Sequence, residues 1–191
     1  MLSRLKYLAI YLPAVFTGML FLSACENDLN KVKEITAADA TQPIQRTTGV
    51  TMIYSDSAKV KAQVTTPLLI EYQTKSPYKI MPKGVKVVFY NADLKEEGNI
   101  IADTGYYYDT KNLIKFHKNV VATNPEGTVY RSEELIWDQA KKQIYSTKQV
   151  VMTKVGGDVM TGTSFVSDQN LKNPVFQNAT AIIHVNGDLT Q

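Results

Sequence analysis

Residues 114–122 have the sequence IKFHKNVVA, in which the even-numbered positions are apolar except for Lys118 and the odd-numbered positions are mostly polar. Successive side chains of an extended strand point to opposite faces, so this period of two predicts a half-buried β-strand. The same alternation occurs at Val85, Val87 and Phe89 and again in residues 175–185. Helical periodicity is nearly absent. The body of the chain is therefore predicted to be all-β.

Glycine and aspartate recur at regular intervals between these predicted strands. The recurring residues are Gly98, Gly127, Gly157 and Gly187, spaced by 29, 30 and 30 residues, and Asp109, Asp138 and Asp168, spaced by 29 and 30. Both residue types favour tight turns, glycine through positive φ and aspartate through bonds to its own backbone. Each period then holds two strands and two turns. This predicts a long stacked antiparallel sheet of hairpins, flat or folded over, although a meander of similar strand lengths gives similar spacing.

The N-terminus has the features of a secretory signal peptide. Arg4 and Lys6 precede an apolar run over residues 7–22, and the string Leu-Ser-Ala-Cys ends at Cys25. Small residues before a cysteine fit cleavage and lipidation of the thiol, and Cys25 is the one cysteine of the chain. The alternative is a transmembrane helix, which needs roughly 20 apolar residues. We expect lipidation at Cys25.

These features divide the chain into three segments. We expect a signal peptide over residues 1–24, a lipidated cysteine and polar linker over 25–48, and a β domain over 49–187. Cleavage of the signal peptide would remove Arg4 and Lys6. The mature chain would then have 19 basic and 18 acidic residues, a net charge of +1. That balance excludes the basic footprint of a nucleic-acid-binding protein.

No motif in the sequence indicates catalysis. Most acidic residues fall in predicted turns, and Glu133 and Glu134, the one acidic pair inside a strand run, are expected to point to opposite faces. His117 and His184 lie far apart without ligand spacing, so no metal and no cofactor are expected. A jelly-roll glycosidase with paired acids stays as a minor alternative.

A folded-over sheet with one apolar face can instead bind lipid. The predicted groove residues are Val87, Phe89, Ile114, Phe116, Val120, Leu135, Trp137, Ile144, Val150, Met152 and Phe165. Alternation does not say whether these side chains face a lipid or one another, and on pattern alone an ordinary packed core is favoured.

From about residue 51 to 185 the sequence resembles the periplasmic lipopolysaccharide-export component LptC and its OstA-like relatives. The strings that carry the resemblance are residues 102–105 (ADTG), followed by Tyr108, Leu113, Phe116 and Val120, then Ser132, Leu135, Trp137 and residues 143–146 (QIYS), and 159–162 (VMTG). Tyr54-Ser55-Asp56, followed by residues 59–64, looks like the opening hairpin of the family. The resemblance implies a twisted β-jelly-roll trough in which Phe89, Phe116 and Trp137 face lipid. It also implies that the protein is not an enzyme.

The resemblance also implies partners and a location. Lipopolysaccharide would come from the permeases of an inner-membrane ABC transporter and pass to an LptA-like periplasmic bridge protein by strand-edge docking. The implied edges are Thr51, Met52, Ile53 and Tyr54 toward the transporter, and Ala181, Ile182, Ile183, His184 and Val185 toward the bridge protein. Well-known members hold the membrane with a helix, whereas this chain has a lipobox. We expect the periplasmic side of the inner membrane, with the outer membrane as the alternative.

One different function stays open at this point. A glycan-binding β-sandwich on the cell surface would need exposed aromatic side chains, and Tyr106, Tyr107 and Tyr108 are the candidates.

Overall fold

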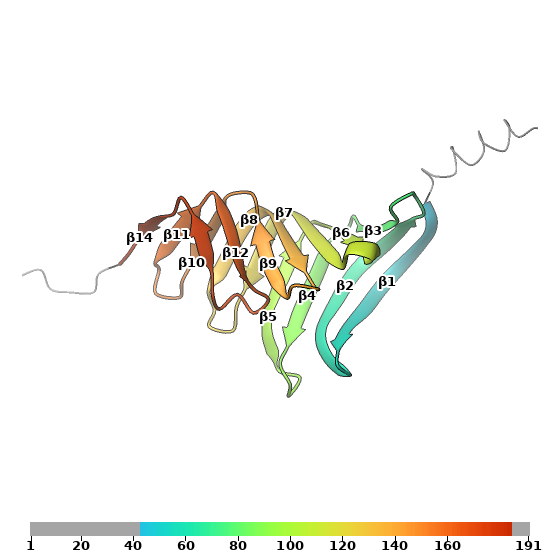
Figure 1. Cartoon of the computed structure of the whole chain (residues 1–191), viewed down its shortest axis with the longest axis horizontal. Helices are drawn as coiled ribbons and strands as arrows, with labels where there is room; N and C mark the ends of the chain where they lie inside the picture. Colours follow the sequence, from blue (N-terminus) through green and yellow to red (C-terminus); the bar gives the residue numbers. More distant parts are fainter. Residues whose placement is uncertain (1–42, 185–191) are drawn as a thin grey trace, which may run out of the picture. The chain divides into compact units, whose positions relative to one another are not determined.

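The structure is a computed structural model that describes residues 43–184. It contains one antiparallel sheet of 14 strands and a short 3-10 turn at Asp109–Lys111 (Figure 1). The strands are β1 (Pro43–Asp56), β2 (Lys59–Tyr72), β3 (Tyr78–Met81), β4 (Val85–Tyr90), β5 (Glu96–Ala102), β6 (Thr104–Tyr108), β7 (Leu113–Thr123), β8 (Val129–Asp138), β9 (Gln143–Ser146), β10 (Val150–Thr153), β11 (Val159–Gly162), β12 (Ser164–Asp168), β13 (Val175–Gln177) and β14 (Thr180–Ile182). The all-β prediction is confirmed, and β1 takes in residues 43–48, which the sequence had placed in the linker.

The sheet folds over because its long strands change partners halfway along. The first half of β2 pairs with β4 and its second half with β3. The strand β7 pairs with β6 in its first half and β5 in its second, and β8 pairs with β10 and then β9. The result is a first layer, β2-β4-β5-β7-β8-β10-β11-β14, and a second layer, β2-β3-β6-β7-β8-β9-β12-β13. The strand β1 follows the whole length of β2. This arrangement is the predicted folded-over trough.

The chain passes between the two layers at evenly spaced corners, which we call the spine. The spine positions follow one another at intervals of 15 residues and are Asp103, Lys118, Glu133, Lys148, Thr163 and Asn178. At Lys118 and Asn119 the φ angles of +64° and +49° produce a bulge in β7. Backbone bonds link neighbouring corners, since the Asp103 N–H donates to the Lys118 carbonyl oxygen at 3.1 Å. The bulge explains why Lys118 interrupts the apolar alternation of residues 114–122.

The opposite ends of the strands are joined by turns, and we call the side on which they lie the seam. Three first-layer turns share one geometry, in which the N–H groups of Asn91, Asn124 and Lys154 donate to the carbonyl oxygens four residues later at 2.9–3.0 Å. In the second layer Asp109, Asp138 and Asp168 each begin a turn. Successive second-layer turns are linked, because the Gln139 N–H donates to the Asn112 carbonyl oxygen and the Gln169 N–H to that of Lys142, both at 3.0 Å. The predicted 30-residue period is therefore a stack of like turns.

Two details of the predicted period were wrong. Gly98 lies inside β5 opposite Phe89, not in a turn, and a Cβ there would meet the Thr123 carbonyl oxygen at 2.6 Å. Leu94, with a φ of +58°, occupies the position that Gly127 and Gly157 take in the later turns. Gly187 lies outside the described residues.

The predicted strand over residues 175–185 also differs in the structure. It is broken into β13 and β14, which belong to different layers, with Asn178 at the corner between them. Val175 is 60% exposed, so the alternation that begins at this residue does not correspond to a buried face.

Candidate functional site: the interior and its two ends

The predicted groove residues all come together between the two layers. Each is at most 4% exposed, and all belong to one apolar cluster contributed by β4, β7, β8, β9, β10 and β12. In this structure they contact one another as a closely packed interior. A lipid can occupy this space only if the layers separate or the side chains rearrange.

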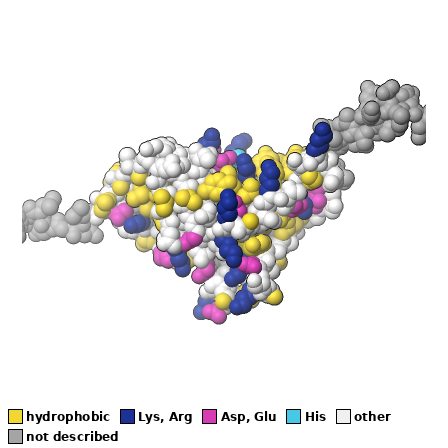
Figure 2. Space-filling view, in the orientation of Figure 1, with side chains coloured by type: hydrophobic (Ala, Val, Ile, Leu, Met, Phe, Trp, Pro, Cys, Tyr) yellow, Lys and Arg dark blue, Asp and Glu magenta, His cyan; other side chains and the backbone are white. Residues whose placement is uncertain are grey.

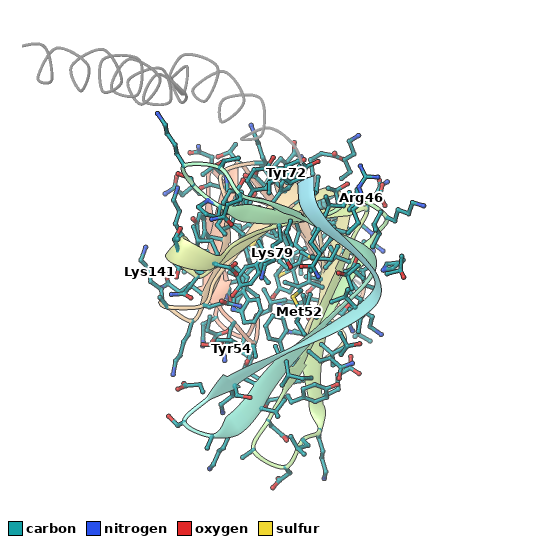
Figure 3. All side chains as sticks on the ribbon, turned by 90° about the vertical axis from the view of Figure 1, so that its right-hand side faces the viewer. Arg46, Met52, Tyr54, Tyr72, Lys79 and Lys141 are labelled. Atoms are coloured by element: carbon teal, nitrogen blue, oxygen red, sulfur yellow. The ribbon has the colours of Figure 1, made fainter. Side chains whose placement is uncertain are left out.

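Half-buried side chains of β1 cover the interior at one end of the sheet. Val50, Met52 and Tyr54 pack against the cluster, and the Tyr54 ring meets Trp137 edge-on with centroids 5.4 Å apart. Trp137 also meets Phe89 edge-on, with ring centroids 4.9 Å apart. Figure 3 views the molecule from this end, with Met52 and Tyr54 on β1. At the opposite end Met160 and Phe176 pack against the cluster in the same way.

The Trp137 indole is, with the Ser167 hydroxyl, one of two buried side-chain polar groups without a hydrogen-bond partner among residues 43–184. It is completely buried, and its Nε1 has no hydrogen-bond partner within the described residues. A buried N–H without a partner costs about 1–3 kcal/mol, so such groups are uncommon in folded proteins. The indole can donate to a carbonyl or amide oxygen brought in by a ligand.

Ionised side chains lie where the turns of the two layers meet. Lys142 Nζ is 2.7 Å from Asp56, and this hydrogen bond is the main cause of the lowered pKa of Asp56 and the raised pKa of Lys142. Lys79 Nζ lies 3.3 Å from Asp109 and 5.8 Å from the centre of the Tyr107 ring. Burial and, secondly, the Asp109 charge raise the pKa of Tyr107. The apolar interior is therefore bordered by paired charges.

Sequence reasoning missed the residue that fills the seam. Leu171, in the turn after β12, is 2% exposed and joins the apolar cluster. Its carbonyl oxygen accepts hydrogen bonds from the Tyr130 hydroxyl at 2.9 Å and from Asn124 Nδ2 at 3.3 Å. Burial raises the pKa of Tyr130 to about 12, so this hydroxyl stays a donor. A leucine with positive φ in a polar turn gives no periodic signal, which is why it escaped prediction.

The two predicted edge segments lie at opposite ends of the sheet. The strand β1 pairs with β2, and within the described residues no strand lies on its other side. Its Thr51 and Ile53 are exposed, whereas Met52 and Tyr54 turn inward. The strand β14 pairs with β11 and ends at Ile182, earlier than predicted. Ile183 and His184 follow as exposed coil, with the His184 N–H bonded to Asp158 at 2.9 Å, and Val185 lies outside the described residues.

The outer face of the second layer carries a separate polar hollow with a volume of about 500 Å³. Its lining residues are Thr104, Tyr106, Tyr108, Lys115, His117, Lys118, Glu133, Glu134 and Lys148. Glu133 and Glu134 both line it, contrary to the expectation of opposite faces, because β8 crosses between the layers here. Tyr107 faces the interior instead. His117 Nε2 lies 3.5 Å from Glu134.

Residues 43–184 contain neither a cluster of metal ligands nor a helix that could span a membrane. No group of three or more His, Cys, Asp or Glu side chains there is arranged to hold a metal ion. No helix in this part of the chain has the length and apolar character needed to cross a membrane. Cys25 and the apolar run before it lie outside the described residues.

A comparison with protein families identifies the chain. The family model for lipopolysaccharide assembly, LptC-related, matches residues 11–180. The chain belongs to the LptC family. Comparison with curated proteins gives no similar sequence. LptC-family members are lipopolysaccharide-transport components that act in the periplasm in association with the inner membrane, and the family is not one of known enzymes. Family membership confirms the resemblance read from the sequence and does not favour glycan binding.

Proposed function

We propose that this LptC-family chain accepts lipopolysaccharide from the permeases of an inner-membrane ABC transporter and carries its acyl chains through the interior between the layers. The lipid enters at the β1 end and leaves at the end formed by β13 and β14. There it passes to an LptA-like bridge protein. The chain itself makes and breaks no covalent bond.

The observation that carries this proposal is the apolar cluster, which extends from the side chains of β1 to Phe165 and Phe176 near the far end. Burial of hydrocarbon contributes about 0.8 kcal/mol per methylene, so one chain of about twelve methylenes gains roughly 10 kcal/mol. That gain opposes the cost of separating the packed side chains. The unpartnered Trp137 N–H supports the same proposal, because acyl esters and amides bring carbonyl oxygens into the interior.

The strand edges support docking at both ends. An end strand presents unpaired backbone N–H and C=O groups that another sheet can extend. Thr51 to Tyr54 of β1 would meet the transporter, and Ala181 and Ile182 of β14, with Ile183 to Val185 after it, would meet the bridge protein. Docking of this kind continues the sheet into the neighbouring protein.

The membrane anchor belongs to the same proposal. Lipidation of Cys25 would hold the chain at the inner membrane in place of a helix, since two or more acyl chains anchor stably. Cells fed labelled palmitate should label the parent chain and not the Cys25→Ala variant. Equal membrane retention of both, without label in either, would favour the transmembrane helix.

Photo-crosslinking in cells tests the conduit. A photoreactive residue at Phe116 or Trp137 should form adducts with lipopolysaccharide, because both side chains lie in the interior. The matched control is Lys115, the neighbour of Phe116 that lines the outer hollow. Adducts at Lys115 but at no interior position would exclude transport through this interior.

A further inference from the structure

The seam differs from the spine in what holds the layers together. Along the spine the chain itself crosses between the layers at every corner. Along the seam, turns from the two layers meet through side-chain contacts. The seam is thus the side on which the layers can part without breaking strand pairing.

Lysine–carboxylate pairs are concentrated on this side. Among residues 43–184 the lysine pairs are Lys79–Asp109, Lys141–Asp138, Lys142–Asp56 and Lys172–Glu97, and each includes a residue of a seam turn or of a strand end beside one. Figure 3 labels Lys141, which precedes Lys142 in the turn between β8 and β9. Figure 2 shows basic and acidic side chains beside apolar ones on one face of the molecule.

Two of these pairs cross the seam, and we call them the latches. Asp56 ends β1 and bonds Lys142 of the second layer at 2.7 Å. Glu97 of β5 lies 3.9 Å from Lys172 and accepts a hydrogen bond from Asn170 Nδ2 at 3.2 Å, both from the second-layer turn after β12. The other two pairs stay within the second layer. Opening of the seam therefore requires both latches to separate, together with the hydrogen bonds from Tyr130 and Asn124 to the Leu171 carbonyl oxygen.

The latches are suited to an exchange of partners. Their side chains are partly exposed, and ion pairs in such positions contribute little to stability. A phosphate group offers a lysine up to two negative charges and several acceptor oxygens, so it can replace a single carboxylate. The apolar interior lies directly behind the seam, because Leu171 of the same turn as Lys172 belongs to the buried cluster.

We propose that the seam is a lateral binding site for a phosphorylated, acylated lipid, in which Lys142 and Lys172 exchange Asp56 and Glu97 for lipid phosphates and the layers part to admit the acyl chains. This inference rests on the proposed function, in which the lipid enters at the β1 end, and adds the head-group site and the side on which the layers part as the lipid moves along the interior. The head group stays outside the seam on the lysines, and the chains occupy the interior.

Two double variants distinguish the effect of breaking the latches from the effect of removing the lysines that would bind phosphate. Asp56→Asn with Glu97→Gln breaks both latches and keeps the lysines. Lys142→Gln with Lys172→Gln breaks both latches and removes the lysines. Lys141→Gln is the matched control, because its partner Asp138 lies in the same turn. Circular dichroism checks that each variant is folded.

The full chain in nanodiscs, with a photoreactive residue at Phe116, is offered diphosphoryl lipid A or the same lipid without phosphates. We expect the parent to crosslink the phosphorylated lipid preferentially. The variant with Asp56→Asn and Glu97→Gln should raise that yield roughly three- to tenfold, because this is the size of effect expected when two weak surface ion pairs no longer compete for the lysines. The lysine variant should crosslink the two lipids equally, and Lys141→Gln should match the parent.

Spin labels at Ala58 and Ala140, exposed residues beside the Asp56–Lys142 latch, report opening of the seam. Their distance distribution should broaden in both double variants. Adducts that do not depend on phosphate, or equal yields in the two double variants, would overturn the inference and leave the conduit standing. Absence of adducts at Phe116 with either lipid in every variant would overturn the conduit itself, and the inference with it.

Discussion

Replacement of Trp137 by Phe should change stability far less than other large-to-small substitutions in the interior. The substitution removes roughly 40 Å³ of side chain, which at about 24 cal/mol per Å³ of cavity costs about 1 kcal/mol. It also removes the buried N–H that has no partner, which relieves about 1–3 kcal/mol. A Phe ring keeps the contacts with Tyr54 and Phe89. The two contributions partly cancel, so the free energy of unfolding should lie between that of the parent and about 2 kcal/mol above it.

Urea unfolding followed by circular dichroism measures this difference, because Trp137 is the one tryptophan and fluorescence is lost with it. Leu135→Ala, at an equally buried neighbour in β8, is the comparison and should cost about 2–5 kcal/mol. A loss in Trp137→Phe as large as that in Leu135→Ala would show that the indole N–H is satisfied. The same variant should crosslink less lipopolysaccharide at Phe116 if the indole donates to lipid.

Three further variants test other parts of the structure. Tyr130→Phe should cost about 1 kcal/mol in urea unfolding, because the buried bond to the Leu171 carbonyl oxygen is lost while that from Asn124 remains; an unchanged midpoint would contradict the bond. Asp56 has a pKa held below 3.8 by Lys142, so its contribution is present above pH 3.8 and lost as pH falls through the lowered pKa. Asp56→Asn should remove that part of the acid dependence of thermal unfolding, whereas an identical acid profile would count against the latch. Ile182→Lys with Ile183→Lys, at 68% and 67% exposed positions, should weaken co-purification with the bridge protein and leave stability within about 0.5 kcal/mol; undiminished co-purification would place docking elsewhere.

The alternation of apolar residues predicted much of the interior because most strands obey a period of two between corners. Val87, Phe89, Ile114 and Phe116 are buried together as that pattern required. The pattern fails at the spine, where Lys118 and Asn119 form a bulge and Glu133 and Glu134 share one outer hollow. At a corner, the face on which a side chain lies changes. The apolar alternation does not mark where the corners are, so the sequence alone does not predict this change.

The contacts across the seam were beyond sequence reasoning for a different reason. Asp56 and Lys142 are 86 residues apart, and each looks like an ordinary charged residue next to a turn. Their meeting depends on how far the two layers close over the interior, which is a property of side-chain packing. The same is true of Leu171, whose burial follows from the placement of its turn.

Because the corners of the spine are evenly spaced, the number of 30-residue units determines the length of the trough. Each 30 residues adds two strands to each layer, as from the second half of β7 to β10 in the first layer. Neighbouring strands lie about 4.8 Å apart, so one such unit lengthens the trough by about 10 Å. Duplication or deletion of a whole unit keeps every corner in phase and changes only the reach of the molecule. A gain or loss of one residue within a strand instead turns the following side chains of that strand to the opposite face, so the protein can lengthen only in whole units.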